Sequence, residues 1–286
     1  GLSSENTSLR KRPSGLTRYH SAGEASFLRG VGVELSRGAH QISLFGSYRP
    51  LDASFLMIDT IENPLVSTLR TSGLHRTQSE VDGRNAVDES ILGGYYQYSS
   101  RLFRAGIGTA AWSVSHSIVP SDELYRLFYF RGSELNSLFI DYRLFLSRLH
   151  LYGEVAVQDF GTPAFMQGFD FRPGGGVELT LAYRYFDHGY MAIFQSPYSR
   201  SSTPGGEQGL YAAIRFQPLK QATITSTLNY YRFSWMRYRV SAPSSGFDYR
   251  LWARYAIDRA NGLVLRYRYS SQERARLNGS SPSKGL

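Results

Sequence analysis

A strict alternation of side-chain types near the end of the chain constrains its fold more than any other feature. Residues 222–230 place Ala, Ile, Ser, Leu and Tyr on one side and Thr and Asn on the other, and the alternation resumes over 247–257 and 263–269. A period of two residues is typical of β-strands, because successive side chains point to opposite faces of a sheet. Strands this long exceed the roughly five or six residues that are common in soluble sheets. The last two stretches also collect their charges on one face, which predicts long strands with two different faces.

The same pattern extends over most of the chain and predicts about twelve strands in six hairpins. Further strands are expected at 24–36, 41–49, 91–99, 102–115, 138–146, 149–158, 165–172, 177–185 and 210–216. Short turns are expected near 37, 100, 147, 174, 219 and 259, and mostly longer connections near 50–90, 116–133, 160–164, 187–206 and 233–245. The later part of the first connection, 78–89, is compatible with a short helix.

In this arrangement the short turns and the longer loops lie at opposite ends of the strands. Bacterial outer-membrane barrels have this asymmetry. No run approaches the roughly 18 apolar residues of a transmembrane helix. We therefore expect an all-β, antiparallel up-and-down transmembrane β-barrel. Residues 1–286 form a single barrel segment, in which 1–22 and 273–286 are loop-like ends and 50–90 is a long loop.

A soluble barrel or sandwich is the alternative, and the two classes differ in which face is the inside. A soluble sheet buries its apolar face, whereas a membrane barrel turns it to lipid and lines its lumen with polar groups. Tyrosines near strand ends favour the membrane, because aromatic rings collect at membrane interfaces. The expected belt consists of Tyr95, Tyr96, Tyr98, Tyr183, Tyr185, Tyr230, Tyr231, Tyr267 and Tyr269.

Composition narrows the chemistry further. The 21 Tyr, 17 Phe and 28 Gly are typical of strands and turns. The absence of cysteine excludes disulfides and cysteine-ligated metal sites. A net charge of +9 favours anionic partners but does not choose among nucleic acid, an anionic membrane and an anionic solute.

Charged side chains on the polar face are the candidate functional residues. The expected lumen-lining basic residues are Arg143, Arg184, Arg215, Arg250, Arg254, Arg266 and Arg268, and the acidic ones are Asp141, Glu154, Glu178 and Asp248. One interpretation is attraction of an anionic solute or nucleic acid into the lumen. The other, which we favour from the sequence, is a set of ion pairs between these arginines and Asp248, Glu154 and Glu178 that stabilises a closed barrel.

Motifs for catalysis are weak. Gly106-Ile107-Gly108 begins a match to the dinucleotide-binding fingerprint, but it lies inside an alternating strand with no helix after it. The six histidines are scattered without ligand-type spacing, and the chain has no Gly-x-Ser-x-Gly elbow. We expect no catalytic residue, metal, cofactor or enzymatic activity.

Several runs resemble the β-barrel of large Bacteroidota outer-membrane proteins described as helix-hairpin-helix domain-containing. The resemblance extends from about Phe27 to Tyr269 and is carried by Leu74–Thr77, Glu80, Asn85-Ala86, Glu89, Gly93-Gly94, Glu207–Ala212 and, most specifically, Tyr231–Gly246. Members of this family carry helix-hairpin-helix repeats upstream and further strands downstream, and neither is present in this sequence. The resemblance therefore implies an internal segment of a larger barrel.

The loop after residue 233 contributes Trp235, Arg237, Tyr238 and Arg239, for which two roles are open. They either bind a partner chain or lipopolysaccharide, or they order the loop over the barrel mouth.

We expect a non-enzymatic protein of the bacterial outer membrane, a porin-like channel or a scaffold within a cell-envelope complex. Its expected partners are outer-membrane lipid or lipopolysaccharide and other envelope proteins. Two alternatives remain: the membrane part of a nucleic-acid-handling or uptake machine, suggested only by the helix-hairpin-helix label and the basic face, and a soluble ligand-binding β-sheet protein.

Overall fold

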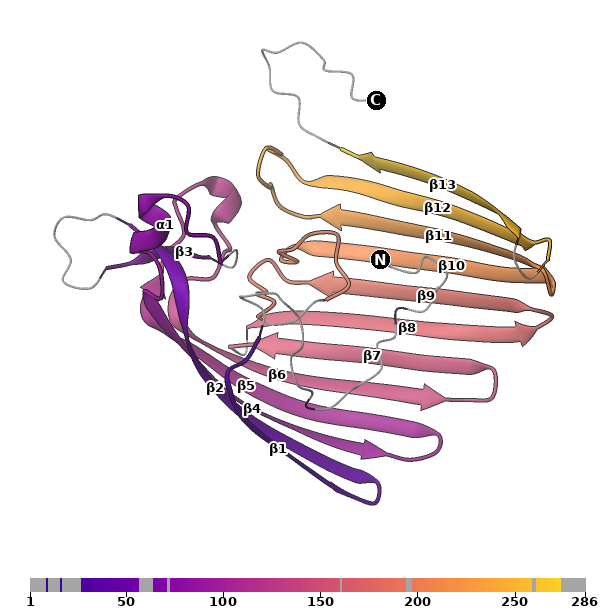
Figure 1. Ribbon diagram of the computed structural model, residues 1–286, viewed down its shortest axis with the longest axis horizontal. Coiled ribbons are helices and arrows are strands. Elements are labelled where there is room, and N and C mark those ends of the chain that lie inside the picture. The colour runs from indigo at the N-terminus through magenta and orange to yellow at the C-terminus, as the bar shows by residue number, and fades with distance from the viewer. Residues whose placement is uncertain are drawn as a thin grey trace, which may run out of the picture.

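The described residues of the computed structural model form an all-β structure with one thirteen-stranded sheet (Figure 1). They are residues 9, 16, 27–56, 64–70, 73–159, 161–193, 197–258 and 261–273. The strands are β1 (Gly30–Arg37), β2 (His40–Phe55), β3 (Val66–Arg70), β4 (Val87–Ser99), β5 (Phe103–Ile118), β6 (Gly132–Phe145), β7 (Leu149–Gln158), β8 (Thr162–Gly174), β9 (Val177–Phe186), β10 (Glu207–Leu219), β11 (Ala222–Phe233), β12 (Ser244–Ala256) and β13 (Gly262–Gln272). The loop-like ends expected from the sequence lie almost wholly outside the described residues.

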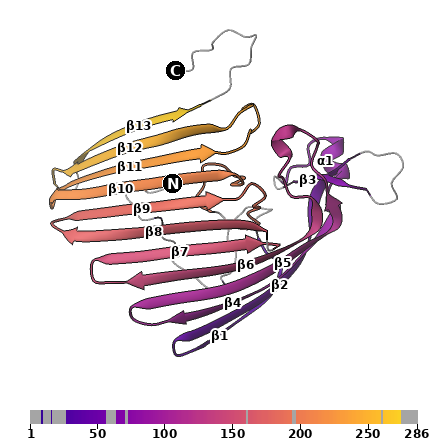
Figure 2. The ribbon, with the colours of Figure 1, turned by 180° about the vertical axis from the view of Figure 1, so that it is seen from behind.

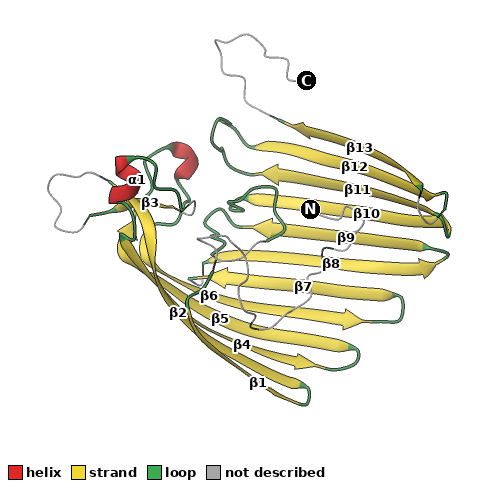
Figure 3. Cartoon of the chain, in the orientation of Figure 1, coloured by secondary structure: helices red, strands yellow, loops and turns green. Residues whose placement is uncertain are grey.

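Neighbouring strands follow the order of the chain. β1, β2 and β4 to β13 pair one after another, and every one of these pairings is antiparallel. The short β3 pairs with the end of β2 and touches β5 through a single parallel bridge. The six short turns and the long strands fall where the alternation predicts them. Figure 3 shows the short turns on one edge and the helices and longer loops on the opposite edge.

The expected long loop over 50–90 is wrong. β2 continues through Pro50 to Phe55, and β4 begins at Val87. Proline removes one donor from a ladder, but the strand persists because Arg49 and Leu51 on either side keep their partners on β4. Between the strands lie β3 and the short helix α1 (Gln78–Asp82), which confirms the predicted helix and begins with a capping box between Thr77 and Glu80.

The two faces of the sheet differ in what covers them. On the face that we call the inner face, the β9–β10 loop packs against the strands, with the ring of Tyr198 5.5 Å from that of Tyr211 and the ring of Tyr190 5.6 Å from that of Phe186. On the outer face, seen in Figure 2, no described element covers the strands. Its apolar side chains are exposed, including Val31 at 80%, Leu92 at 69% and Val155 at 51%.

The sheet has two free edges. β1 pairs only with β2, and β13 pairs only with β12, so the described strands do not close into a ring. At the long-loop edge, Ala53, Val66, Val87, Trp112 and neighbouring residues form the largest buried apolar cluster. Among the described residues, no helix has the length and apolar character needed to cross a membrane.

Candidate binding surface on the inner face

All the charged residues selected from the sequence lie on the inner face. The register places Asp141 opposite Glu154, Glu178 opposite Arg215, and Arg250 opposite Arg268. Because side chains alternate strictly along each strand, this sharing of one face follows directly from the period of two. Arg143, Arg184, Asp248, Arg254 and Arg266 occupy equivalent positions on their strands.

Most of the tyrosines expected in a belt lie on the outer face, and two do not. Tyr96 and Tyr230 are exposed on the outer face, whereas Tyr95 and Tyr231 each follow the opposite phase of the alternation and face inward. Tyr95 donates a hydrogen bond to Asp141 Oδ2 at 2.6 Å, and Tyr231 is fully buried. Two tyrosines that are adjacent in a strand cannot both point to the same face of the sheet.

Two of the acids on the inner face, Asp248 and Glu178, pair with arginines other than those expected. Asp248 Oδ2 lies 3.2 Å from Nε of Arg200, a residue of the β9–β10 loop, and Glu178 Oε1 lies 3.1 Å from Nε of Arg172 on β8. Ser270 also donates to Asp248, at 2.5 Å. Sequence reasoning missed Arg172 because it lies beside the turn of its hairpin, and missed Arg200 because loop residues carry no periodic signal.

The most buried ion pair joins Arg184 on β9 to Glu207 at the start of β10. Nε of Arg184 donates to Oε1 of Glu207 at 2.8 Å, and Nη1 donates to Asn229 at 2.9 Å. Glu207 also accepts the backbone N–H groups of Arg200 and Ser201, which ties the loop to the sheet. A buried charge requires such partners, because desolvation otherwise costs several kcal/mol per ion.

A glycine makes room for this pair. Gly209 faces Arg184 across the β9–β10 ladder, and a Cβ added at Gly209 would lie 2.3 Å from Cζ of Arg184. The guanidinium group therefore lies flat over the backbone of Gly209 and beneath Tyr198, whose ring centroid is 5.0 Å from Cζ. In the sequence, Glu207 stands out only as part of the run 207–212 that carries the family resemblance, and it precedes the strand expected at 210–216.

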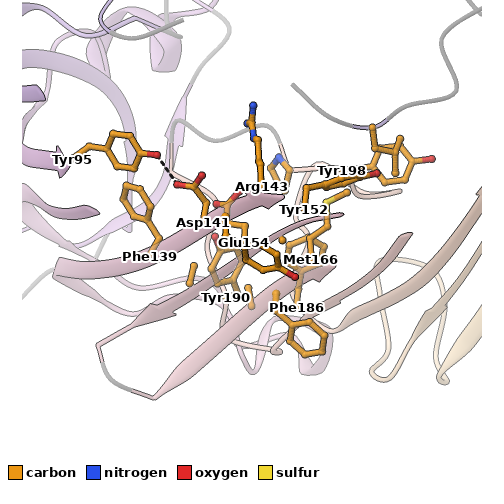
Figure 4. Close-up of a pocket in the computed structure, with 17 residues that line it drawn as sticks. Tyr95, Phe139, Asp141, Arg143, Tyr152, Glu154, Met166, Phe186, Tyr190 and Tyr198 are labelled. Carbon is orange, nitrogen blue, oxygen red and sulfur yellow. Dashed lines mark hydrogen bonds between the residues drawn. The ribbon is translucent and has the colours of Figure 1, made fainter. Parts of the chain in front are cut away.

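A cavity of about 480 Å³ opens between this loop and the inner face of β6, β7 and β8 (Figure 4). The register places Asp141 and Glu154 side by side in its wall, with Arg143 nearby. Aromatic residues supply most of the rest, namely Tyr95, Phe139, Tyr142, Tyr152, Phe165, Phe186, Tyr190 and Tyr198. Aromatic walls with a few charged groups suit a polar ligand that also presents apolar surface.

The glycines of the dinucleotide-like motif leave room for two side chains in the wall of this cavity. Gly106 and Gly108 lie inside β5, which continues as a strand past the motif to Ile118. A Cβ at Gly106 would lie 2.0 Å from the hydroxyl of Tyr95, and one at Gly108 would lie 2.3 Å from the ring of Phe139. The motif therefore provides space for two aromatic rings of the cavity, and the rejection of a nucleotide fingerprint is consistent with this placement.

The loop residues selected from the sequence take part in a cap at the long-loop edge. The indole N–H of Trp235 donates to the carbonyl of Leu124 at 3.0 Å, and its ring lies 5.1 Å from that of Phe128. Arg237 lies 3.8 Å above the ring of Phe233 and donates to Ser201 Oγ. Burial lowers the pKa of Arg237. These contacts favour the ordering role over a free binding loop.

Two further residues of this loop are more exposed. Tyr238 contacts the ring of Tyr125 at 5.8 Å, and Arg239 lies 5.0 Å from the ring of Tyr238. Arg239 adopts a φ of 62°, a conformation that costs most L-residues about 1–2 kcal/mol. A cavity of about 390 Å³ lies beneath the cap and is lined by residues of the loops after β5, β9 and β11.

The inner face offers charge and aromatic surface for binding. Within the described ranges, no group of three or more His, Asp or Glu side chains is placed to hold a metal ion. The arrangement is suited to holding a solute or a partner chain by ionic and aromatic contacts.

Comparison with known proteins gives no neighbour. No family model matches the chain, and neither a curated protein nor a solved structure matches it. The resemblance to helix-hairpin-helix domain-containing barrels stays a prediction from the sequence.

Proposed function

We propose that these strands are part of a transmembrane β-barrel of the bacterial outer membrane, which acts as a channel or as a scaffold in an envelope complex. The supporting observation is the outer face, where exposed apolar side chains follow every strand from β1 to β13 except the short β3. A soluble protein rarely exposes apolar patches larger than a few hundred Å². In lipid the same surface needs no cover.

Aromatic residues at both ends of the outer face add support. Tyr96, Phe103, Phe216 and Tyr255 lie near the short turns, and Phe165, Tyr183, Tyr230 and Phe247 lie near the long loops. Two such rows are typical of the interfacial girdles of membrane barrels. The strands, most of them 10 to 16 residues long, also reach the roughly 9–11 residues that a tilted spanning strand needs.

The free edges support a barrel of more strands. Among the described strands, β1 and β13 each have a row of backbone groups without a strand partner on one side. Hydrocarbon cannot satisfy these groups, so open sheet edges do not occur at membrane depth. In this proposal further strands, supplied from outside these residues, close the ring.

The alternative of a soluble sheet protein requires the apolar face of the strands to be a buried core. In the structure the apolar outer face is exposed instead, so this alternative has less support. The nucleic-acid alternative has no observation in its favour beyond the basic side chains of the inner face.

The lipid contact of the outer face is the feature to test. The native tryptophans do not report on it, because Trp112 and Trp252 lie on the inner face and Trp235 lies in the cap. We suggest Ile140→Trp on the outer face of β6, with the adjacent inner-face change Phe139→Trp as its control. In vesicles containing brominated lipid, emission from the Trp at position 140 should be quenched and that from position 139 should not.

Equal quenching at the two positions, or recovery of the full chain as a soluble monomer without detergent, would refute the proposal. Outer-membrane fractionation and heat-modifiable gel mobility provide independent checks.

A further inference from the structure

Three arginines on β12 and β13 gather on the inner face without an acidic partner. Arg250 and Arg268 are directly opposed in the register, and Arg266 lies one inward position away, opposite Trp252. All three side chains are exposed. Within the part of the chain that the structure describes, no carboxylate lies within ion-pair distance of any of them.

This juxtaposition is unfavourable unless something offsets it. Like charges directly opposite each other destabilise a pair of strands. The nearest acid along β12 is Asp248, whose oxygens are engaged by Ser270 and Arg200. The sheet therefore holds a concentration of positive charge that its own described acids do not neutralise.

The tryptophan at the centre of the cluster gives a second, independent indication. Cζ of Arg266 lies 4.4 Å from the centroid of the Trp252 ring, so the guanidinium group is held over the indole. The indole N–H is buried and has no hydrogen-bond acceptor among the described residues. A buried donor without a partner costs about 1–3 kcal/mol.

We infer that Arg250, Arg266 and Arg268 form a binding site for an oxyanion, a phosphate, sulfate or carboxylate group carried by a solute. Guanidinium groups bind such groups through paired hydrogen bonds, and a planar fork already held by an aromatic ring loses little freedom on binding. An oxygen of the bound anion would also supply the acceptor that the Trp252 indole lacks. The site stands on the geometry of β12 and β13 alone.

Its role in transport rests on the proposed function. If the inner face lines a lumen, this cluster raises the local concentration of anionic solutes and favours their passage over that of cations.

Inorganic tripolyphosphate is a suitable probe, titrated into the full chain in detergent and followed by calorimetry. Trp252 emission reports on location, since it is the tryptophan within the cluster. We expect saturable binding with a change in emission that Trp252→Phe abolishes. Arg250→Gln with Arg268→Gln should weaken binding about tenfold or more, because two charge-assisted contacts are lost.

Two further variants separate charge from geometry. Arg250→Lys with Arg268→Lys retains the positive charge but removes the planar guanidinium groups with their paired N–H donors. This variant should bind tripolyphosphate less tightly than the native chain. Arg37→Gln with Arg101→Gln removes the same charge at two short turns and should bind tripolyphosphate like the native chain. Arg37 is the last residue of β1 and Arg101 lies in the turn between β4 and β5, so both lie outside the inner-face cluster.

Binding that is absent, or that the glutamine pair and the turn pair weaken equally, would overturn the site. These results do not depend on membrane location. Binding of the probe together with failure of the lipid-quenching test would support the anion site and refute the membrane barrel. Successful quenching without binding of the probe would support the barrel and refute the site.

Discussion

Arg184 and Glu207 form an ion pair whose side chains are only 1% and 0% exposed, at the point where the β9–β10 loop meets the sheet. Nη2 of the arginine lies 2.7 Å from the same carboxylate oxygen that accepts from Nε. The carboxylate therefore joins the strand arginine to the loop backbone.

Removing the acid should unfold the loop and weaken the sheet. Glu207→Gln leaves a buried guanidinium group without its counter-charge, which costs about 3–5 kcal/mol. We expect that loss in the free energy of unfolding, measured by urea titration of the full chain in detergent. Arg184→Met combined with Glu207→Met should cost less than the single change. Glu123→Gln breaks an exposed pair with Arg126 and should cost about 0.2–1 kcal/mol.

Gly209→Ala should disturb the same pair from the other side. The added Cβ meets the guanidinium carbon at 2.3 Å, so the arginine has to leave its position over the backbone. Overpacking of this kind typically costs about 1–3 kcal/mol. Gly46→Ala is the matched control, because its new Cβ meets nothing closer than 3.8 Å. If the two changes alter the urea midpoint equally, the close approach at Gly209 is unimportant.

A charge on the outer face should prevent membrane insertion. Val155→Arg places a guanidinium group among exposed apolar side chains, where lipid contact costs about 2–4 kcal/mol at the midplane. Gln41→Arg places the same group on the inner face, between the uncharged residues Ser36 and Gln97 on the neighbouring strands. We expect a lower folded yield in vesicles for the first variant and a native yield for the second, judged by heat-modifiable gel mobility. The reverse order would mean that the faces are assigned wrongly.

Trp235→Ala should loosen the cap. The change removes the hydrogen bond to the Leu124 carbonyl and the ring contact with Phe128, which together join two loops. Hydrogen exchange in residues 119–131 should become about tenfold faster or more, as local opening costs less. Leu127→Ala alters an exposed side chain of the same segment and should leave exchange unchanged. Equal protection in both variants would mean that the cap does not depend on Trp235.

Alkaline pH should release the loop at Tyr190. Burial, with a smaller contribution from the charge of Glu154, raises the pKa of Tyr190 to about 12. The folded state therefore holds this proton more tightly than the unfolded state does. The contribution of the protonated Tyr190 to the free energy of unfolding is fully present below pH 10 and is lost as the pH rises toward 12. The difference in phenolate absorbance between the native chain and Tyr190→Phe should titrate near 12, and a midpoint near 10 would exclude burial of this hydroxyl.

Periodicity was enough to predict the twelve longer strands and the face of the selected charged residues, but not the short β3. Asp141, Glu178 and Arg250 share one face because a period of two fixes side-chain direction wherever the strand is correctly placed. The strand ends were less predictable, as at Pro50, where pairing on both sides outweighs the loss of one donor.

Contacts between distant segments were beyond the sequence pattern. Glu207, Arg200 and Arg172 became partners of strand residues through a loop fold and a hairpin turn that no periodicity encodes. The tyrosine belt shows a different error. Residue type alone places Tyr95 and Tyr231 with their neighbours on the outer face, but their positions in the alternation direct both side chains to the inner face.

The alternation of strand direction also limits how a ring could be completed. Twelve strands pair in series with each antiparallel to the last, so β1 and β13 run in opposite directions. A closed ring in which every neighbouring pair of strands is antiparallel has an even number of strands, because strand direction alternates at each step around the ring. Strands added between these two edges must therefore come in pairs, as whole hairpins or as pairs of strands from elsewhere.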